Sequence, residues 1–261
     1  MPQADELLVE RRDAVAWLTV NRPEVRNALS LALIRSLADT LRTLSQDRAV
    51  RVFVLAGAGE RVFISGADVR EFREHLGTPE DALAYDAACE ELQSALRAVP
   101  QPVIAMIQGH AVGSGCIVAA SCDFRIAVRG AKFGLPVAKF GFIAPVPDLL
   151  RLVDLVGPAK ARWLLMTGRL VEAPEALAIG LIDQVVEPEG LRAAVEDLAA
   201  TLAANAPLTL KATKQMIEQL TGPSADVRVG APWYREVFQS RDFQEGLDAF
   251  FAKRKPEFRG E

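Results

Sequence analysis

The chain has 261 residues, half of them hydrophobic, and 30 basic against 34 acidic residues give a net charge of −4. This balance, with no local block of Lys and Arg, excludes a protein that binds through the phosphate backbone of nucleic acid. Three cysteines and two histidines fit no metal-ligand spacing, so we predict no metal site. Without a secretion signal in the opening residues or an apolar run of about 20 residues, we expect a cytoplasmic enzyme that does not enter a membrane.

The first quarter of the chain combines short strands with one helix. Residues 7–11 and 15–20 alternate in character and predict a hairpin with one buried face. Ser30 is a suitable N-cap for a helix whose leucines recur at helical spacing. Residues 50–56 and 62–64 are apolar runs, which predict buried strands.

A second helix begins after Thr78. Threonine is a good N-cap and Pro79 suits the first helical position, so both favour a helix start here. The helix runs to about Val99, where Pro100 and Pro102 stop it.

The middle of the chain returns to strands. Residues 103–107, 123–128 and 132–134 are predicted as strands. Between the first two lies a loop of small residues at 109–115, which leads into a short helix from about Cys116.

The remainder is helical from Leu149 onward, apart from one strand at 181–186. Repeated strand–strand–helix units followed by a helical tail predict an α/β fold. We divide it into a core at 1–190 and a helical region at 191–261, which packs on the core or on a neighbouring subunit.

Two loops join a strand to a helix through small residues, at 63–68 and 109–116. Glycine lets the backbone approach a ligand, and a helix start leaves N–H groups without partners. Two converging N–H groups suit an oxyanion; the alternative is that both loops are tight turns chosen for packing. Neither loop completes a nucleotide-binding glycine pattern.

Six segments in chain order resemble the enoyl-CoA hydratase/isomerase (crotonase) superfamily, and together they cover nearly the whole chain. They are NRPEVRNAL at 21–29, FISGADVREF at 63–72, PVIAMIQGHAVGSGCIVAASCDFRIA at 102–127, AKFGLP at 131–136, TGRLVEAPEALAIGLIDQVV at 167–186 and FFAKRKPEF at 250–258. The resemblance implies a crotonase-like spiral of ββα units with a C-terminal helical trimerisation region. It also implies a homotrimer or a dimer of trimers, and an acyl-CoA substrate with no cofactor beyond the coenzyme A of that thioester.

The same resemblance implies roles for particular residues. The thioester carbonyl is expected between the backbone N–H groups of Ala67 and Ser114, although the family usually has glycine at the second position. For Arg26, Arg70 and Lys253, the alternative is an exposed, solvated side chain. The residues expected to contact coenzyme A are Val25, Arg26, Ala28, Ala67, Asp68, Val69, Arg70, Phe250 and Lys253.

The sequence departs from the family at the acid/base positions. Hydratases of the family use two glutamates, but the matching positions here are Ile117 and Val137, and a third acidic position of some isomerases is Pro145. Loss of both a general acid and a general base, each worth about 10²–10⁴ in rate, is expected nearly to abolish ordinary hydration.

Asp148 is the only carboxylate in residues 133–150 and is therefore the candidate replacement acid/base. The alternative is that it caps a helix at 149–156. His110 is expected to be packed or at the surface. Glu71, Glu74 and His75 are expected to face solvent, and the alternative is that they enter the site.

Three function classes follow from the resemblance. The first is an acyl-CoA enzyme that stabilises a thioester enolate. The second is a CoA-thioester hydrolase or decarboxylase, and the third is a non-catalytic acyl-CoA-binding homologue.

Overall fold

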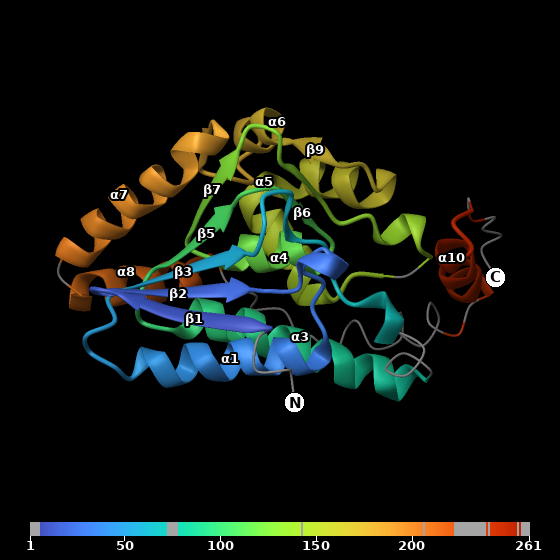
Figure 1. The fold of residues 1–261 in the computed structure, drawn as a ribbon. Helices are drawn as coiled ribbons and strands as arrows, with labels where there is room; N and C mark the ends of the chain where they lie inside the picture. The colour runs from blue at the N-terminus through green and yellow to red at the C-terminus, as the bar shows by residue number, and fades with distance from the viewer. Residues whose placement is uncertain are drawn as a thin grey trace.

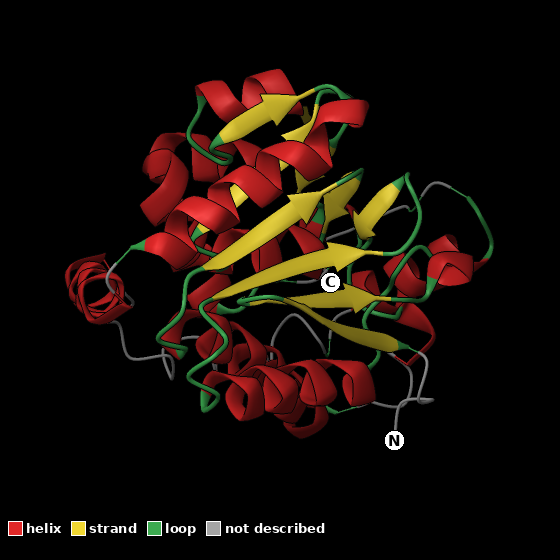
Figure 2. Ribbon diagram, turned by 60° about the vertical axis from the view of Figure 1, so that its left-hand side comes forward, coloured by secondary structure: helices red, strands yellow, loops and turns green. Residues whose placement is uncertain are grey.

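The computed structural model describes residues 6–71, 78–141, 143–205, 207–221, 239, 241–254 and 256. Two sheets are flanked by helices (Figures 1 and 2). The larger sheet contains β1 Leu7–Arg12, β2 Val15–Val20, β3 Val52–Gly57, β5 Val103–Ile107, β7 Phe124–Val128 and β10 Gln184–Val186, in that order. The smaller contains β4 Val62–Ile64, β6 His110–Val112, β8 Lys132–Gly134 and β9 Val171–Glu172.

Helices supply the rest of the described fold. The α-helices are α1 Leu31–Ser45, α3 Pro79–Ala98, α4 Ser114–Ser121, α5 Val146–Thr167, α6 Ala173–Ala178, α7 Leu191–Ala204, α8 Pro207–Thr221 and α10 Arg241–Phe251. Short 3₁₀ turns are η1 Pro23–Val25, η2 Val69–Glu71, η3 Val137–Lys139 and η4 Pro188–Gly190.

The predicted hairpin is confirmed: β1 and β2 pair antiparallel, whereas the other neighbours in the larger sheet pair parallel. Every residue of β3 is buried, as expected for an apolar run in a parallel sheet covered on both faces. Helices α1 and α3 run side by side on one face, and α7 packs on β3, β5 and β7 (Figure 1). The division at residue 190 remains a prediction.

Two predicted helix starts are confirmed by their capping bonds. The Ser30 hydroxyl accepts a hydrogen bond from the Leu33 N–H at 3.2 Å. The Thr78 hydroxyl accepts one from the Asp81 N–H at 3.1 Å, with Pro79 at the first helical position.

The small-residue loop predicted at 109–115 is partly wrong, because three of its residues form β6 and α4 begins at Ser114 rather than near Cys116. Strand β6 is short and pairs with both β4 and β8, so tertiary pairing rather than local apolar pattern creates it. The parallel pairing of β4 with β6 places the two glycine loops beside each other. A Cβ added to Gly66, whose φ is +122°, meets the Val112 carbonyl oxygen at 3.3 Å.

Helix α5 contains a kink at Gly157, whose φ of 71° is left-handed and is followed by Pro158. Among the helices of the described residues, we find none both long and apolar enough to cross a membrane.

Candidate active site

A cavity of about 520 Å³ lies where the two glycine loops meet α3, α10 and the segment that leads into α5. Its rim carries exposed charged side chains, including Arg26 and Arg70, and its lining also includes the buried Gln93 and Asp148. All residues predicted to contact coenzyme A line it except Lys253: Val25, Arg26, Ala28, Ala67, Asp68, Val69, Arg70 and Phe250. Lys253 lies in an adjoining hollow of about 430 Å³ that shares Phe250 with the cavity.

Ala67 and Ser114 both line this cavity, and their backbone N–H groups have no acceptor among the described residues. Leu29 forms a parallel bridge with Ala67, donating to the Gly66 carbonyl and accepting from the Asp68 N–H, both at 2.8 Å. Because alternate N–H groups of an extended chain point to opposite sides, the Ala67 N–H is directed away from that bridge. Ser114 opens α4, where the first N–H groups have no intrahelical acceptor.

A buried ion pair holds the first glycine loop. Arg22 lies 3.1 Å from the Asp68 carboxylate and donates to the Ala28 carbonyl at 2.7 Å. A hydrogen bond from Arg70 lowers the pKa of Asp68, so this carboxylate is ionised and engaged by two guanidinium groups. Asp68 therefore holds the first glycine loop in place through these two ion pairs, and it also lines the cavity.

The loop at 21–29 turns through two consecutive left-handed residues, Arg26 and Asn27. The Asn27 side chain accepts from the Arg22 N–H and donates to the carbonyls of Ala58 and Val62. Asparagine tolerates this conformation and bonds the backbone locally, so the residue type of Asn27 is the signal in the sequence that indicates this turn.

Asp148 lies in the cavity wall and is 7 % exposed. Helix α5 begins at Val146 with Pro145 as its N-cap, so the alternative that Asp148 caps a helix starting at Leu149 is wrong. Instead, its Oδ1 accepts a hydrogen bond of 2.7 Å from Gln93 Nε2.

Burial raises the pKa of Asp148 to about 7, against the opposing effects of the Gln93 hydrogen bond and the Arg97 charge; the Glu90 charge adds to the rise. A carboxyl that titrates near neutral pH is suited to general acid/base work.

One face of α3 supplies further cavity residues that the sequence did not single out: Tyr85, Cys89 and Gln93, four residues apart. This spacing puts them on one face of a helix. Burial raises the pKa of Tyr85 and of Cys89 well above their ordinary values, so both carry their protons at neutral pH. The signal in the sequence is the occurrence of polar side chains at helical spacing, at positions where a helix that faces the core normally carries apolar residues.

The three residues that replace the family's acid/base groups lie at different places relative to the cavity. Val137 and Pro145 line it, whereas Ile117 is fully buried in α4 outside its lining. His110 is exposed on β6, and its pKa is lowered by burial and by the charge of Lys132. Glu74 and His75 lie outside the described residues.

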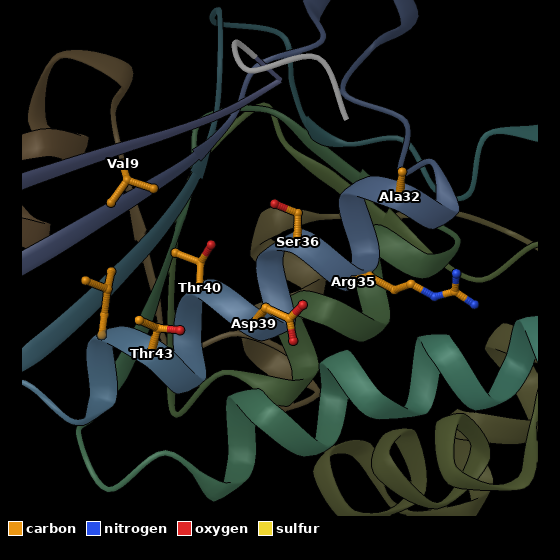
Figure 3. Close-up of a pocket in the computed structure, with 8 residues that line it drawn as sticks. Val9, Ala32, Arg35, Ser36, Asp39, Thr40 and Thr43 are labelled. Carbon is orange, nitrogen blue, oxygen red and sulfur yellow. The ribbon is translucent and has the colours of Figure 1, made fainter. Parts of the chain in front are cut away.

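Within the described ranges, no group of three His, Cys, Asp or Glu side chains is placed to hold a metal. A further hollow of about 530 Å³ lies between β1 and α1 (Figure 3). Its charged lining residues, Arg35 and Asp39, are exposed, and it contains none of the predicted site residues, so it is not a candidate active site.

Comparisons with known proteins show the family of this chain. The sequence model of the enoyl-CoA hydratase/isomerase family matches residues 10–261. The crotonyl-CoA hydratase of Syntrophomonas wolfei is 33 % identical over 258 residues, covering 97 % of this chain and 98 % of that protein. The chain therefore belongs to the enoyl-CoA hydratase/isomerase family.

Solved structures show the same fold. An enoyl-CoA hydratase/carnithine racemase from Magnetospirillum magneticum is 38 % identical, with a TM-score of 0.82 and coverage of 99 % of this chain and 97 % of that one. A methylmalonyl-CoA decarboxylase complexed with 2S-carboxypropyl-CoA is 27 % identical, with a TM-score of 0.91 and coverage of 99 % and 100 %. The predicted crotonase-like α/β fold is confirmed.

Proposed function

We propose that this protein is an acyl-CoA enzyme that forms a thioester enolate in the cavity described above. The observation that carries the proposal is the pair of unpartnered N–H groups, Ala67 and Ser114, in a cavity that also contains Asp148. Negative charge develops on a thioester oxygen as an enolate forms, and two fixed donors stabilise it without reorganisation.

Asp148 is the proposed proton carrier. As a carboxylate it removes a proton from the acyl chain, and as a carboxylic acid it returns one; its pKa of about 7 makes both forms available at neutral pH. Proton removal and return by one side chain suits isomerisation, since no water needs to be activated.

Ordinary hydration is expected to be slow. Val137 offers no proton at the cavity wall, and Ile117 is buried outside it. We expect crotonyl-CoA hydration to fall orders of magnitude below a typical turnover of about 10 s⁻¹.

Decarboxylation is a second candidate. Cleavage of an acyl carboxylate as CO₂ leaves the enolate directly, so it needs the oxyanion donors and one proton but no base. The apolar side chains of Val137 and Pro145 at the cavity wall favour it, as does the structural similarity to a methylmalonyl-CoA decarboxylase.

One assay separates the candidate functions. The purified protein is incubated with a panel of enoyl-, acyl- and carboxyacyl-CoA thioesters, and double-bond position, CO₂, free thiol and product mass are followed. A shifted double bond at unchanged mass supports the proposal, and CO₂ release supports the second candidate. Thiol release would show a hydrolase instead, and binding without turnover a non-catalytic homologue.

The coenzyme A moiety is proposed to lie along Val25, Arg26 and Ala28, with Phe250 and Lys253 towards its adenine and phosphate.

The fold class further leads us to expect a cytoplasmic protein that forms a homotrimer or a dimer of trimers. Sedimentation of the purified protein tests this oligomeric state.

A further inference from the structure

We propose that Arg97 is a positioning residue for Asp148, and that Glu218 on α8 holds Arg97 in this role by pairing with both Arg97 and Arg151. The inference rests on the proposed function, because it concerns the proton carrier of that function. It gives a role in the site to α8, a helix of which no described residue lines the cavity.

The first step is the contact between α3 and α5 at the cavity. Gln93 on α3 donates a hydrogen bond of 2.7 Å from its Nε2 to Oδ1 of Asp148 on α5, and both residues are buried. The bond joins two helices that are far apart in the sequence. It therefore depends on the contacts that hold α3 against α5.

The second step is a cluster of three charged side chains about one helical turn from that bond. Arg97 follows Gln93 by four residues on α3, and Arg151 follows Asp148 by three residues on α5, which are the spacings of neighbours on one helix face. Glu218 joins them, since its Oε2 lies 3.4 Å from Arg97 Nε and its Oε1 lies 3.1 Å from Arg151 Nη2. One carboxylate thus ties α3 to α5.

The third step is the burial of this cluster. The side chains of Arg97, Arg151 and Glu218 are 12 %, 13 % and 23 % exposed, so solvent and salt screen their charges less than those of a surface pair. Burial raises the pKa of Asp148 to about 7, and the Arg97 charge opposes that rise together with the Gln93 hydrogen bond. Arg97 therefore acts on Asp148 by its charge as well as by its place on α3.

The other titratable groups around Asp148 do not replace Arg97. Glu90 raises the pKa of Asp148, and burial keeps Tyr85, Cys89 and Cys116 protonated and neutral. The titratable or charged side chains on the elements packed there are Tyr85, Asp86, Cys89, Glu90 and Arg97 on α3, Cys116 on α4, Lys139 on η3, Arg151 and Asp154 on α5, and Glu218 on α8. Among the described residues, Arg97 is the cation whose charge stabilises the Asp148 carboxylate.

Helix α8 is itself fixed to the end of α3, one turn before Glu218. Lys214 is buried there, and its Nζ lies 2.7 Å from the Asp123 carboxylate and donates to the carbonyls of Leu96 and Gln101 at 3.0 and 3.1 Å. This anchor sets the position from which Glu218 reaches the two arginines.

The test follows exchange of the α-protons of butanoyl-CoA with solvent deuterium by mass spectrometry, using the full-length protein. In this exchange the Asp148 carboxylate takes a proton as an α C–H bond breaks, and the enolate then takes a deuteron from the exchanged carboxylic acid. The exchange rate of the unaltered protein is expected to rise with pH through an apparent pKa of about 7. Arg97→Met is expected to move this rise about one pH unit higher, which lowers the rate at neutral pH about fivefold.

Binding of butanoyl-CoA, measured by calorimetry, is expected to be unchanged by the substitution. Arg97→Lys keeps the cation and is expected to keep the pH profile. Arg125→Met is the matched control, because it removes another buried arginine, whose pair with Asp183 lies outside the cavity lining. It is expected to lower stability without moving the profile.

Urea unfolding gives a second readout that needs no substrate. Because the pKa of Asp148 in the folded protein rises further in Arg97→Met, the fall in unfolding free energy with pH is expected to continue about one pH unit beyond that of the unaltered protein. If Arg97→Met does not fold, Arg97→Gln is used, because its amide can still donate to Glu218 while the charge is lost. The same shift is expected.

Two kinds of failure are distinguishable. If Asp148→Asn abolishes exchange but loss of the Arg97 charge moves neither the exchange profile nor the unfolding profile, the inference is overturned and the proposed function stands. An equal shift in Arg125→Met or Arg97→Lys would also overturn the inference. Absence of exchange in the unaltered protein, or exchange that Asp148→Asn leaves unchanged, would overturn the proposed function and the inference with it.

Discussion

The two sides of the cavity offer different chemistry. The glycine loops present backbone N–H groups at Ala67 and Ser114, whose positions are set by the pairing of β4 with β6. The opposite wall, from α3 and the start of α5, presents the side chains of Gln93 and Asp148. Backbone donors persist through side-chain substitution, whereas acid/base groups are lost or moved by single changes. A shared family fold therefore supports a shared mode of thioester binding more strongly than a shared reaction.

The largest expected effect on turnover comes from replacing Asp148, the acid in the side-chain wall of the cavity, which is the side formed by α3 and the start of α5. Asp148→Asn keeps the shape of the side chain but removes its ability to transfer a proton. Turnover of the preferred thioester is expected to fall about 10²–10⁴-fold with little change in binding, measured by steady-state kinetics and calorimetry. Unchanged turnover would leave Asp148 with a purely structural role and would favour chemistry carried by the substrate.

The backbone wall is tested by Ser114→Pro, which deletes the N–H donor at the first position of α4, where proline is tolerated by a helix. One oxyanion donor is worth about 10²–10³ in rate, so turnover is expected to fall by that factor. Ser114→Ala keeps the N–H group and is the matched control, with turnover close to that of the unaltered protein. Equal losses in both variants would show that the hydroxyl, not the backbone, makes the contact.

The two walls also differed in how well the sequence predicted them. The glycine loops could be placed because small residues follow the apolar runs at 62–64 and 103–107. Gly66 and Gly113 in these loops both adopt the positive φ that favours glycine. Their meeting depends on β6, a three-residue strand that no local pattern indicates. The resemblance of the sequence segments to the family, rather than their periodicity, predicts that the two loops lie close together.

The side-chain wall was harder to predict because its contacts join residues far apart in the chain. Asp148 was identified as the only carboxylate in its segment, but residue preference alone favoured a helix cap. Only the structure shows that α5 begins two residues before Asp148 and that Gln93 is its partner. Similarly, nothing local in Arg22 indicates a buried pair with Asp68, since the two are 46 residues apart.

The buried carboxyl predicts a pH dependence of stability. Its pKa is raised from 3.8 to about 7 in the folded protein, so the folded state binds a proton that the unfolded state releases above about pH 4. The free energy of unfolding is therefore expected to fall as pH rises from 4 to 7, by an amount of the order of 4 kcal/mol, and to level off above 7. Urea unfolding across this range measures the effect, and Asp148→Asn is expected to remove that contribution. A pH dependence identical in both proteins would contradict the raised pKa.

The buried Arg22–Asp68 ion pair, which holds the first glycine loop, is expected to contribute more to the free energy of unfolding than any surface ion pair. Arg22→Met leaves the buried Asp68 with only Arg70 and removes a bond to the Ala28 carbonyl, at a cost of about 3 kcal/mol of unfolding free energy. Arg129→Met breaks a pair with Glu187 in which both side chains are 61 % exposed, and is expected to cost below about 1 kcal/mol. Urea unfolding compares the two, and equal costs would show that the loop does not depend on the buried pair.

The smallest effect is expected at the rim of the cavity, where we propose that exposed cations contact the coenzyme A moiety. Lys253 lies two residues beyond the end of α10, in the hollow that adjoins the cavity, and is exposed. An ion pair between an exposed ammonium and a phosphate is screened by solvent, so Lys253→Ala is expected to raise KM by no more than about fivefold and to leave kcat unchanged. The increase is expected to shrink in high salt, because screening weakens the contact that the variant removes. Lys211→Ala is the control: this exposed lysine lies on α8, at the opposite side of the molecule from α10 (Figure 1). A fall in kcat for Lys253→Ala would show that this lysine does more than bind coenzyme A. An equal rise in KM for Lys211→Ala would show that the effect is not specific to the hollow beside α10.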